Sequence, residues 1–492
     1  MGKKMSGRRA FKTDVSFLEK ISAGAVGTTR VFEDLGRQGH SPIELERGSM
    51  SFKIWKKIKI KRVRVPDILC VKCGTRVESR AKTDLQVTMS HSTSDPSRGW
   101  DFGLTDGDFI AFVNCVKSGE RPIDWKADDL VQYVKVKEMR EAVAENKVLS
   151  VEPKGATEGF EARLTWPSAI AKSEGRVTSI DRNCLKYRRK NDGRTIRLSL
   201  KKGELALASL VSTGVTVKRN QILGSVVPVS DKIHCSGALD QEYYLDLIKS
   251  TSLSDRYAAA KALSYFKSDE TILALKKRVS DEKEHIYIRL ESASSLLKIG
   301  NRESVPFFKK MLDDPYLENR LECVIVLGEI GQSDSSDLLI GALLDSNQHP
   351  EIRAGAAWSL GELRDKKALN ALVTAFDAVD KDIRVEAARA MVKLNELFAN
   401  ETLKLMPASN DSQRAGISWS LSKSGNFTVH DLIAVMADND ARKWIAWIIG
   451  TQKEQKYISQ IEELRQRDNE VYFAVTVLWK VISSWINGLE IY

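Results

Sequence analysis

An arginine recurs at nearly constant spacing through the C-terminal half of the chain, and this repeat constrains the fold more than any other feature. Successive members lie 33, 31, 33, 31, 30 and 28 residues apart. The series consists of Arg256, Arg289, Arg320, Arg353, Arg384, Arg414 and Arg442. A period of about 30 residues is typical of a solenoid, in which each unit packs only against its neighbours.

Each arginine opens a segment with the spacing of an amphipathic helix, as in IRAGAAWSLGELR at 352–364. Small and apolar residues at positions i, i+3 and i+4 give one buried stripe per helix. Acidic residues precede many of these helices, where a helix N-terminus favours negative charge. An apolar partner helix lies between successive arginines, as in SVPFFKKML at 304–312.

These segments resemble the HEAT repeats of the phycobilisome-lyase type. The resemblance covers residues 240–492 and implies an α-solenoid that binds a protein partner. It does not imply lyase activity, because one fold carries many functions. We expect each recurring arginine to pack or pair with an acidic residue of the neighbouring repeat, and a phosphate-binding stripe is the alternative.

Basic charge is concentrated at the N-terminus. Residues 1–66 contain 16 Lys+Arg and 6 Asp+Glu, a net charge of +10, which equals the net charge of the whole chain. Such asymmetry indicates a polyanionic partner, most often DNA or RNA. The strand-like run FKIWKKIKIKRVRV supplies the candidate phosphate contacts Lys57, Lys59, Lys61, Arg62 and Arg64. A solubilising tail is the alternative.

The composition favours a soluble protein of several domains. No run of 18 or more apolar residues occurs among the 492, and no apolar segment follows the basic N-terminus. The six cysteines are mostly isolated, which favours a reducing compartment. We therefore expect a cytoplasmic location, no membrane association, and two to four domains.

Residues 146–235 form a predicted all-β domain. The segment NCLKYRRKNDGRTIRLSLKK reads as a hairpin with its turn at Asn191-Asp192-Gly193. Its basic side chains include Arg188, Arg189 and Lys190, a second candidate nucleic-acid contact, with a solvated hairpin as the alternative. The segments EGRVTSI and VSTGVTVKRNQILGSVVPV resemble the barrel-sandwich hybrid of biotinyl and lipoyl domains. The carrier lysine of that family is missing at the turn, so the resemblance implies a structural or binding domain without a cofactor.

Residues 1–145 form a predicted basic α/β domain. A helix over 14–39 precedes a strand, a hairpin PDILCVKCGTRVESRAK and a buried strand DFIAFVNCV. This order resembles the mixed-sheet core of the PD-(D/E)xK nucleases. The resemblance implies phosphodiester hydrolysis with Mg²⁺ held by Asp67 and Glu78, and Glu33 as a supporting carboxylate.

The hairpin departs from this family at its lysine, because Arg80 stands two residues after Glu78. Arginine does not readily give up a proton. Lys82 lies on the same strand face and is the alternative catalytic cation. The domain is therefore either an active nuclease that uses Lys82 or a site that only binds.

Cys70-x-x-Cys73-Gly74 resembles half of a zinc knuckle. A structural zinc needs four ligands, and the chain has no second C-x-x-C. His91, Cys115 or Cys184 would have to complete the set. The sequence therefore favours two thiols that flank a tight turn over a structural zinc.

Two functional hypotheses follow from these patterns. The first is a nucleic-acid-binding, nuclease-like enzyme that requires Mg²⁺ and carries a HEAT scaffold for a partner. The second is a non-enzymatic HEAT adaptor anchored by its basic N-terminal module. Metal-dependent cleavage of DNA or RNA distinguishes them.

Overall fold

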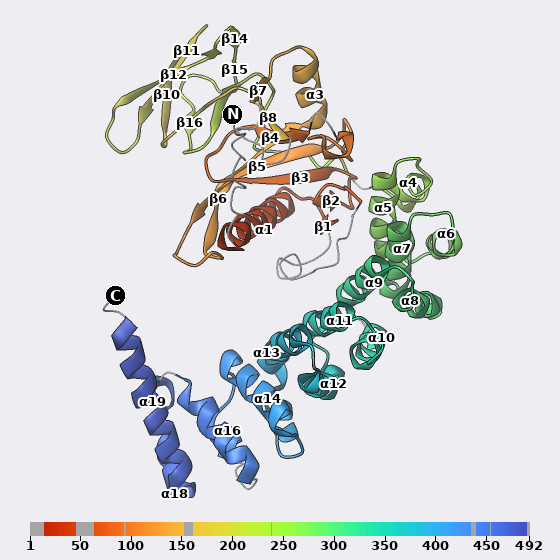
Figure 1. The fold of residues 1–492 in the computed structure, drawn as a ribbon. Helices are drawn as coiled ribbons and strands as arrows, with labels where there is room; N and C mark the ends of the chain where they lie inside the picture. The colour runs from red at the N-terminus through yellow and green to blue at the C-terminus, as the bar shows by residue number, and fades with distance from the viewer. Residues whose placement is uncertain are drawn as a thin grey trace, which may run out of the picture. The chain divides into compact units, whose positions relative to one another are not determined.

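The computed structural model describes residues 14–45, 63–92, 95–151, 161–237, 239–331, 333–433, 439–452 and 454–489 (Figure 1). The chain divides into two compact units. The N-terminal unit ends at Leu263, and the C-terminal unit begins at Ser264. Each unit is described by itself.

A five-stranded mixed sheet forms the centre of the N-terminal unit. Its order is β1 (Pro42–Glu44), β2 (Ile68–Cys70), β3 (Arg76–Lys82), β5 (Phe109–Lys117) and β6 (Trp125–Lys135). The pair β3–β5 is parallel, and the other neighbours are antiparallel. Helix α1 (Asp14–Arg37) packs on β3, β5 and β6 (Figure 1). The core between them includes Val31, Leu35, Val77, Ala111 and Val113.

A second sheet in the same unit joins two segments that were predicted to belong to different domains. Strand β4 (Thr88–Ser92) pairs with β8 (Glu161–Thr165), which pairs with β7 (Leu149–Val151). Trp100 and Trp166 meet edge to face at 5.1 Å in a core that also contains Phe112 and Ile222. Helix α3 (Val136–Ala144) packs into this core through Met139. The predicted boundary at 145/146 therefore falls inside one compact unit.

The remaining strands are short and antiparallel. A four-stranded sheet has the order β12 (Thr195–Ser199), β11 (Cys184–Arg189), β10 (Gly175–Asp181) and β16 (Thr216–Val217). A three-stranded sheet contains β15 (Ala208–Ser209), β17 (Ile222–Ser225) and β9 (Ser168–Ile170), and β13 (Lys201–Lys202) pairs with β14 (Leu205–Ala206). The β11–β12 hairpin confirms the predicted one, and Gly193 has φ +67° at its turn.

Two helices after the strands belong to the N-terminal unit as well. They are α4 (Gln241–Leu247) and α5 (Leu253–Ala262). The buried guanidinium of Arg76 donates to both carboxylate oxygens of Asp108 at 2.8 Å and to Asp255 of α5 at 2.7 Å. The hydroxyl of Tyr244 in α4 donates to the carbonyl of Val71 at 2.6 Å. These contacts fix both helices against the β2–β3 hairpin.

The C-terminal unit is helical throughout the part that the structure describes. Its α-helices are α6 (Asp269–Ser280), α7 (Ile286–Lys298), α8 (Val305–Leu312), α9 (Leu317–Ile330), α10 (Ser333–Leu344), α11 (Pro350–Leu363), α12 (Leu369–Thr374), α13 (Lys381–Leu405), α14 (Asp411–Ser424), α15 (Val429–Ile433), α16 (Asn439–Gly450), α17 (Glu454–Tyr457), α18 (Ile461–Arg467) and α19 (Asn469–Leu489). The arginine-led helices α7, α9, α11, α13, α14 and α16 pack in sequence order, each against the next (Figure 1). Over the described ranges, no helix has both the length and the apolar character that a membrane span requires.

Small residues let these helices approach closely. A Cβ added to Gly328 on α9 would lie 2.7 Å from the hydroxyl of Ser359 on α11. A Cβ added to Gly361 on α11 would lie 2.8 Å from the Cα of Ala390 on α13. Gly328 and Gly361 are therefore helix-packing residues, because a larger side chain would push the backbones apart.

The recurring arginines act within their own repeats, which differs from the expected pairing with acidic residues. Arg289 donates to the carbonyl of Val279 at 3.0 Å, and Arg353 donates to that of Leu343 at 2.8 Å. Arg256, Arg320, Arg384 and Arg414 also bond to backbone carbonyls, but these lie in the connections just before their own helices. The last carbonyls of a helix have no intrahelical donor, so a guanidinium that reaches back satisfies them. Arg442 differs, because it pairs with Asp468 at 2.6 Å.

Candidate functional site

The β2–β3 hairpin places the two predicted metal ligands side by side. Ile68 pairs with Val77 and Leu69 with Arg76, so the next position aligns Asp67 with Glu78. The Asp67 carboxylate accepts the backbone N–H of Ser79 at 2.7 Å. Facing residues of an antiparallel pair have Cβ atoms about 4.5–5.5 Å apart, which suits two carboxylates that share one ion.

The Glu78 carboxylate already forms an ion pair with Arg80. Its guanidinium nitrogen lies 2.6 Å from Glu78 Oε1, and the Glu78 side chain is only 14% exposed. An ion pair at this distance is a charge-assisted hydrogen bond, which is stronger than a neutral one. A divalent metal ion would have to compete with Arg80 for Glu78.

A cationic hollow of about 730 Å³ lies beside the last residues of β3. Its basic lining residues are Lys20, Arg80, Lys82 and Arg163, and its acidic ones are Glu19 and Asp84. Both acids already have partners, since Lys117 lies 2.6 Å from Glu19 and Lys172 lies 3.4 Å from Asp84. The hollow therefore presents a net positive charge.

Lys82 is the most perturbed cation of this hollow. Its ammonium donates to the carbonyl of Thr88 at 2.6 Å and to its hydroxyl at 3.0 Å. Burial, with Arg80 and Arg163 nearby, lowers the pKa of Lys82 to about 8. A bound anion would favour the charged ammonium again, because an opposite charge nearby raises the pKa of a lysine.

Glu33 does not reach this hollow. Its side chain is 58% exposed and forms an ion pair with Arg30 at 3.5 Å. The acid of α1 that lines the hollow is Glu19. The two acids are 14 residues apart, which corresponds to about 21 Å along a helix. No sequence signal marked Glu19, because it stands in an ordinary amphipathic helix.

The predicted N-terminal phosphate contacts are mostly outside the described residues. Lys57, Lys59, Lys61 and Arg62 all fall in that category. Arg64 is exposed, and its guanidinium donates to the carbonyl of Gly99 at 3.3 Å. The role of this segment stays a prediction.

The β11–β12 hairpin and the neighbouring strand β10 carry an exposed cationic face, here called the cationic sheet face. It consists of Arg176, Lys186, Arg188 and Arg197 on β10, β11 and β12, all exposed. Arg176 stands directly opposite Arg188, and Lys186 opposite Arg197. Of the three residues predicted here, Arg188 belongs to this face. Arg189 pairs instead with Asp192 at 3.2 Å, and Lys190 with Glu174 at 3.5 Å.

Cys70 and Cys73 lie in a cluster that the sequence did not reveal. Together with His40 and Cys235 they place one ligand atom each within 4.8 Å of all the others. The residues expected to complete the set lie elsewhere. His91 accepts the N–H of Trp100 at 3.4 Å, Cys115 contacts the carbonyl of Ala23, and Cys184 contacts Arg197. His40 and Cys235 each stand alone in the sequence, so no spacing motif pointed to them.

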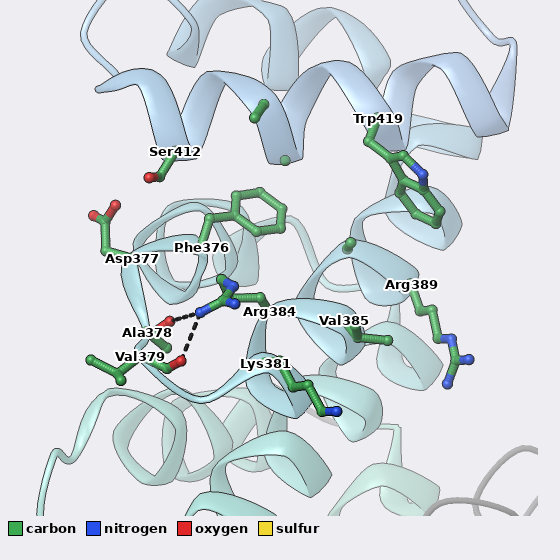
Figure 2. A pocket seen from close by; sticks show the side chains of 13 residues that line it. Phe376, Asp377, Ala378, Val379, Lys381, Arg384, Val385, Arg389, Ser412 and Trp419 are labelled. Atoms are coloured by element: carbon green, nitrogen blue, oxygen red, sulfur yellow. Dashed lines mark hydrogen bonds between the residues drawn. The ribbon is translucent and has the colours of Figure 1, made fainter.

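The solenoid has a hollow between α13 and α14 (Figure 2). Its volume is about 870 Å³. Figure 2 shows Trp419 of α14 and Val385 of α13 on its walls, with Phe376 at its back. A Cβ added to Gly416 would lie 2.4 Å from the Phe376 ring, so this glycine allows the ring to pack there.

Comparison with known proteins identifies the repeats. Residues 244–320 and 305–392 match the family of HEAT repeats. No curated protein matches the chain. The CpcE–CpcF complex of phycocyanin lyase from Nostoc sp. PCC7120 is 19% identical over 51% of this chain and 97% of that chain, with a TM-score of 0.25. Computationally designed armadillo repeat proteins for peptide recognition are 14% identical over 43% of this chain and 99% of theirs, with a TM-score of 0.23.

The family match and the ordered packing of the arginine-led helices lead to one conclusion about the C-terminal unit. The matched residues, 244–320 and 305–392, include helices α7, α9 and α11, which pack against one another in sequence order. The nuclease-like and barrel-sandwich resemblances of the first 235 residues remain predictions. The C-terminal part of this chain is an α-solenoid that contains HEAT repeats.

Proposed function

We propose that the protein is a scaffold whose solenoid binds an extended, acidic segment of a protein partner in the α13–α14 hollow. The observation that carries this proposal is the exposure of apolar side chains around a cavity. Val379 is 97% exposed, Val385 46% and Trp419 37%. Exposed apolar groups that line a cavity favour a partner that covers them.

The charge of the hollow selects the occupant. Its cations are Lys381, Arg384 and Arg389, of which Arg389 already pairs with Glu386 at 2.5 Å. Its only acid among the lining residues is Asp377, which already accepts hydrogen bonds from Asn410 at 3.0 Å and from Gln413 at 2.6 Å. A segment with an apolar anchor beside Asp or Glu residues complements both properties.

Arg384 is one of the recurring arginines of the repeats and also lines this hollow. Its guanidinium donates to the carbonyls of Ala378 and Val379 at 2.6 and 2.8 Å (Figure 2). These bonds hold the loop before α13 and fix the cation at the rim. A rigid cation loses less entropy when it binds a carboxylate, which favours affinity.

A selection of random peptides on the full-length protein tests the proposal. We expect enriched peptides to combine a large apolar residue with acidic ones. Trp419→Ala should weaken a selected peptide by about 30-fold, as measured by fluorescence polarisation, because a central aromatic residue contributes about 2 kcal/mol or more. Val385→Asp should weaken it as well, because it places a carboxylate against an acidic peptide. The control is Leu273→Ala, since Leu273 is 71% exposed and does not line the hollow. Basic peptides, or equal binding by all variants, would contradict the proposal.

A second candidate function is nucleic-acid binding by the N-terminal unit. The cationic sheet face favours it, because like charges directly opposite each other on a sheet are destabilising. Arg176–Arg188 and Lys186–Arg197 are two such pairs. A phosphate backbone that lies across this face would relieve both repulsions.

A more specific version of this second candidate is hydrolysis of the phosphodiester bonds of the bound nucleic acid. The alignment of Asp67 with Glu78 supports it, as does the order of α1, three antiparallel strands and a strand parallel to β3. Mg²⁺ held by the two carboxylates would polarise a phosphate and activate water. Lys82 and Arg80 would bind the phosphate from the hollow. The Arg80–Glu78 ion pair opposes metal binding, so binding without cleavage is the better supported outcome.

Fluorescence anisotropy with single- and double-stranded DNA and RNA separates these outcomes. We expect Arg176→Glu with Arg188→Glu to weaken binding to every sequence and to reduce the salt dependence. Lys190→Glu is the control, because Lys190 already has an acidic partner. Cleavage with Mg²⁺ or Mn²⁺ that disappears in Asp67→Ala and Glu78→Ala would establish an enzyme. Unchanged binding in the double variant would exclude the cationic sheet face.

A further inference from the structure

We propose that His40, Cys70, Cys73 and Cys235 form a structural zinc site with three thiolates and one imidazole. These residue types are the ligands that Zn²⁺ prefers, and four protein ligands complete a tetrahedron. The four ligand atoms lie within 4.8 Å of one another. His40 and Cys70 are buried, while Cys73 and Cys235 are half-buried.

The sulfur–nitrogen distance in this cluster fits a tetrahedral ion. Bond lengths of about 2.3 Å for Zn–S and about 2.0–2.1 Å for Zn–N place a sulfur and a nitrogen ligand about 3.6 Å apart. The observed distance between Cys73 Sγ and His40 Nδ1 is 3.4 Å. The pair therefore has the spacing of two ligands on one ion.

The surroundings orient each ligand. His40 Nε2 lies 3.0 Å from the carbonyl of Ile233. If Nε2 donates its proton to this oxygen, the lone pair of Nδ1 points toward Cys73, which is the arrangement found at histidine zinc ligands. The backbone N–H of Ser41 donates to Cys70 Sγ at 3.3 Å. A hydrogen bond of this kind stabilises a thiolate.

The turn between the two hairpin cysteines is shaped as a knuckle. Gly74 has φ +71°, a conformation that favours glycine, and its N–H donates to the carbonyl of Cys70 at 2.8 Å. A Cβ at this position would also lie 2.8 Å from Leu239 Cδ1. The turn therefore brings both sulfurs to one side with no room for a larger residue.

The proposed ion would join three segments that are far apart in sequence. His40 follows α1, Cys70 and Cys73 flank the β2–β3 turn, and Cys235 precedes α4. The N–H of Leu239 donates to the carbonyl of Lys72 at 2.6 Å, which adds a hydrogen bond between the β2–β3 turn and the segment that follows Cys235. A site with four protein ligands leaves no position for substrate, so its role is to hold the chain that leads into α4.

Metal analysis of the reduced full-length protein tests this site. We expect one zinc ion per chain, and less than a tenth of that in Cys235→Ser and His40→Ala. Cys184→Ser is the matched control, because Cys184 is buried in the same unit and lies outside the cluster. Replacement of zinc by Co²⁺ should give the visible bands of a tetrahedral ion and a thiolate-to-cobalt charge-transfer band.

His40→Cys separates loss of a ligand from loss of the fold. A four-thiolate site should keep the metal, and its charge-transfer band with Co²⁺ should be more intense than that of the wild type. Three results would overturn the proposal: a wild type without metal under reducing conditions, a Cys235→Ser variant that keeps full stoichiometry, or a native mass that shows a disulfide among the three thiols in place of an ion.

Discussion

The two units of this protein use the same side chain in opposite ways. In the N-terminal unit, Arg76 joins carboxylates that are 32 and 179 positions away in sequence. In the solenoid, Arg353 reaches a carbonyl only 10 positions back. Arg76 links segments that are far apart in the sequence of the N-terminal unit, whereas Arg353 bonds within a single repeat. A buried long-range charge and a local cap therefore have very different consequences when they are removed.

The largest effect is expected from Arg76. Its side chain is 6% exposed, and its loss would leave the buried Asp108 without its main partner. We expect Arg76→Met to lower the free energy of unfolding of the N-terminal unit by about 3–5 kcal/mol, since an unpaired buried charge is strongly unfavourable. Denaturant unfolding monitored by circular dichroism measures this change.

The control for Arg76 is Arg121→Met. Arg121 also pairs with an aspartate, Asp124 at 2.7 Å, but its side chain is 74% exposed. We expect a change below about 1 kcal/mol, as for other surface ion pairs. Equal losses in the two variants would show that burial is not what distinguishes them.

Two glycines test whether close approach of the helices controls the stability of the solenoid. Gly361→Ala places a Cβ 2.8 Å from the backbone of Ala390, and we expect a net loss of about 1–2 kcal/mol because the helices must move apart. Gly341→Ala meets nothing within 4 Å on α10, and we expect a gain of up to about 1 kcal/mol from helix propensity. Thermal unfolding of the two variants should shift in opposite directions. Shifts of the same sign would show that close approach does not control this interface.

The smallest effect concerns Lys82 and the pH. Its pKa is lowered to about 8 from 10.5, so the folded chain loses this proton before the unfolded chain does. Stability should therefore rise with pH between these two values. Affinity for inorganic phosphate or an oligonucleotide in the hollow should fall by up to about tenfold from pH 7 to pH 9, as the ammonium is neutralised.

Lys82→Met tests whether this lysine is the cause. The variant should bind weakly at both pH values and show a flatter profile, although Arg80, Arg163 and Lys20 still face the hollow. The control is Lys249→Met, because Lys249 is 65% exposed and neither it nor its partner Asp246 lines the hollow. A wild-type profile that stays flat would remove Lys82 from the binding site.

The solenoid was predictable because its information is local. Each repeat needs one arginine, one apolar stripe and one small residue, and all of these recur within about 30 residues. The period was read correctly. The expected acidic partner is found for Arg442, whereas Arg289 and Arg353 bond to backbone carbonyls. A backbone carbonyl leaves no trace in the sequence, whereas an acidic side chain does.

The N-terminal unit was less predictable because its elements meet across long separations. The hairpin register that aligns Asp67 with Glu78 is local and followed from the turn. In contrast, the pairing of β4 with β8 joins residues on both sides of the expected boundary, with Ser90 opposite Arg163. The approach of His40 and Cys235 to the thiols likewise depends on the completed fold.

The arginine caps have a consequence for how such an array changes in length. Because Arg289 and Arg353 each bond to the helix that precedes them, a duplicated α6–α7 or α10–α11 stretch would encode a unit that already contains its own cap. The new copy would need only the small-residue seam that Gly361 and Ala390 provide between neighbours. Lengthening or shortening the array by such whole units therefore leaves these caps satisfied, whereas an insertion between a helix end and its arginine does not.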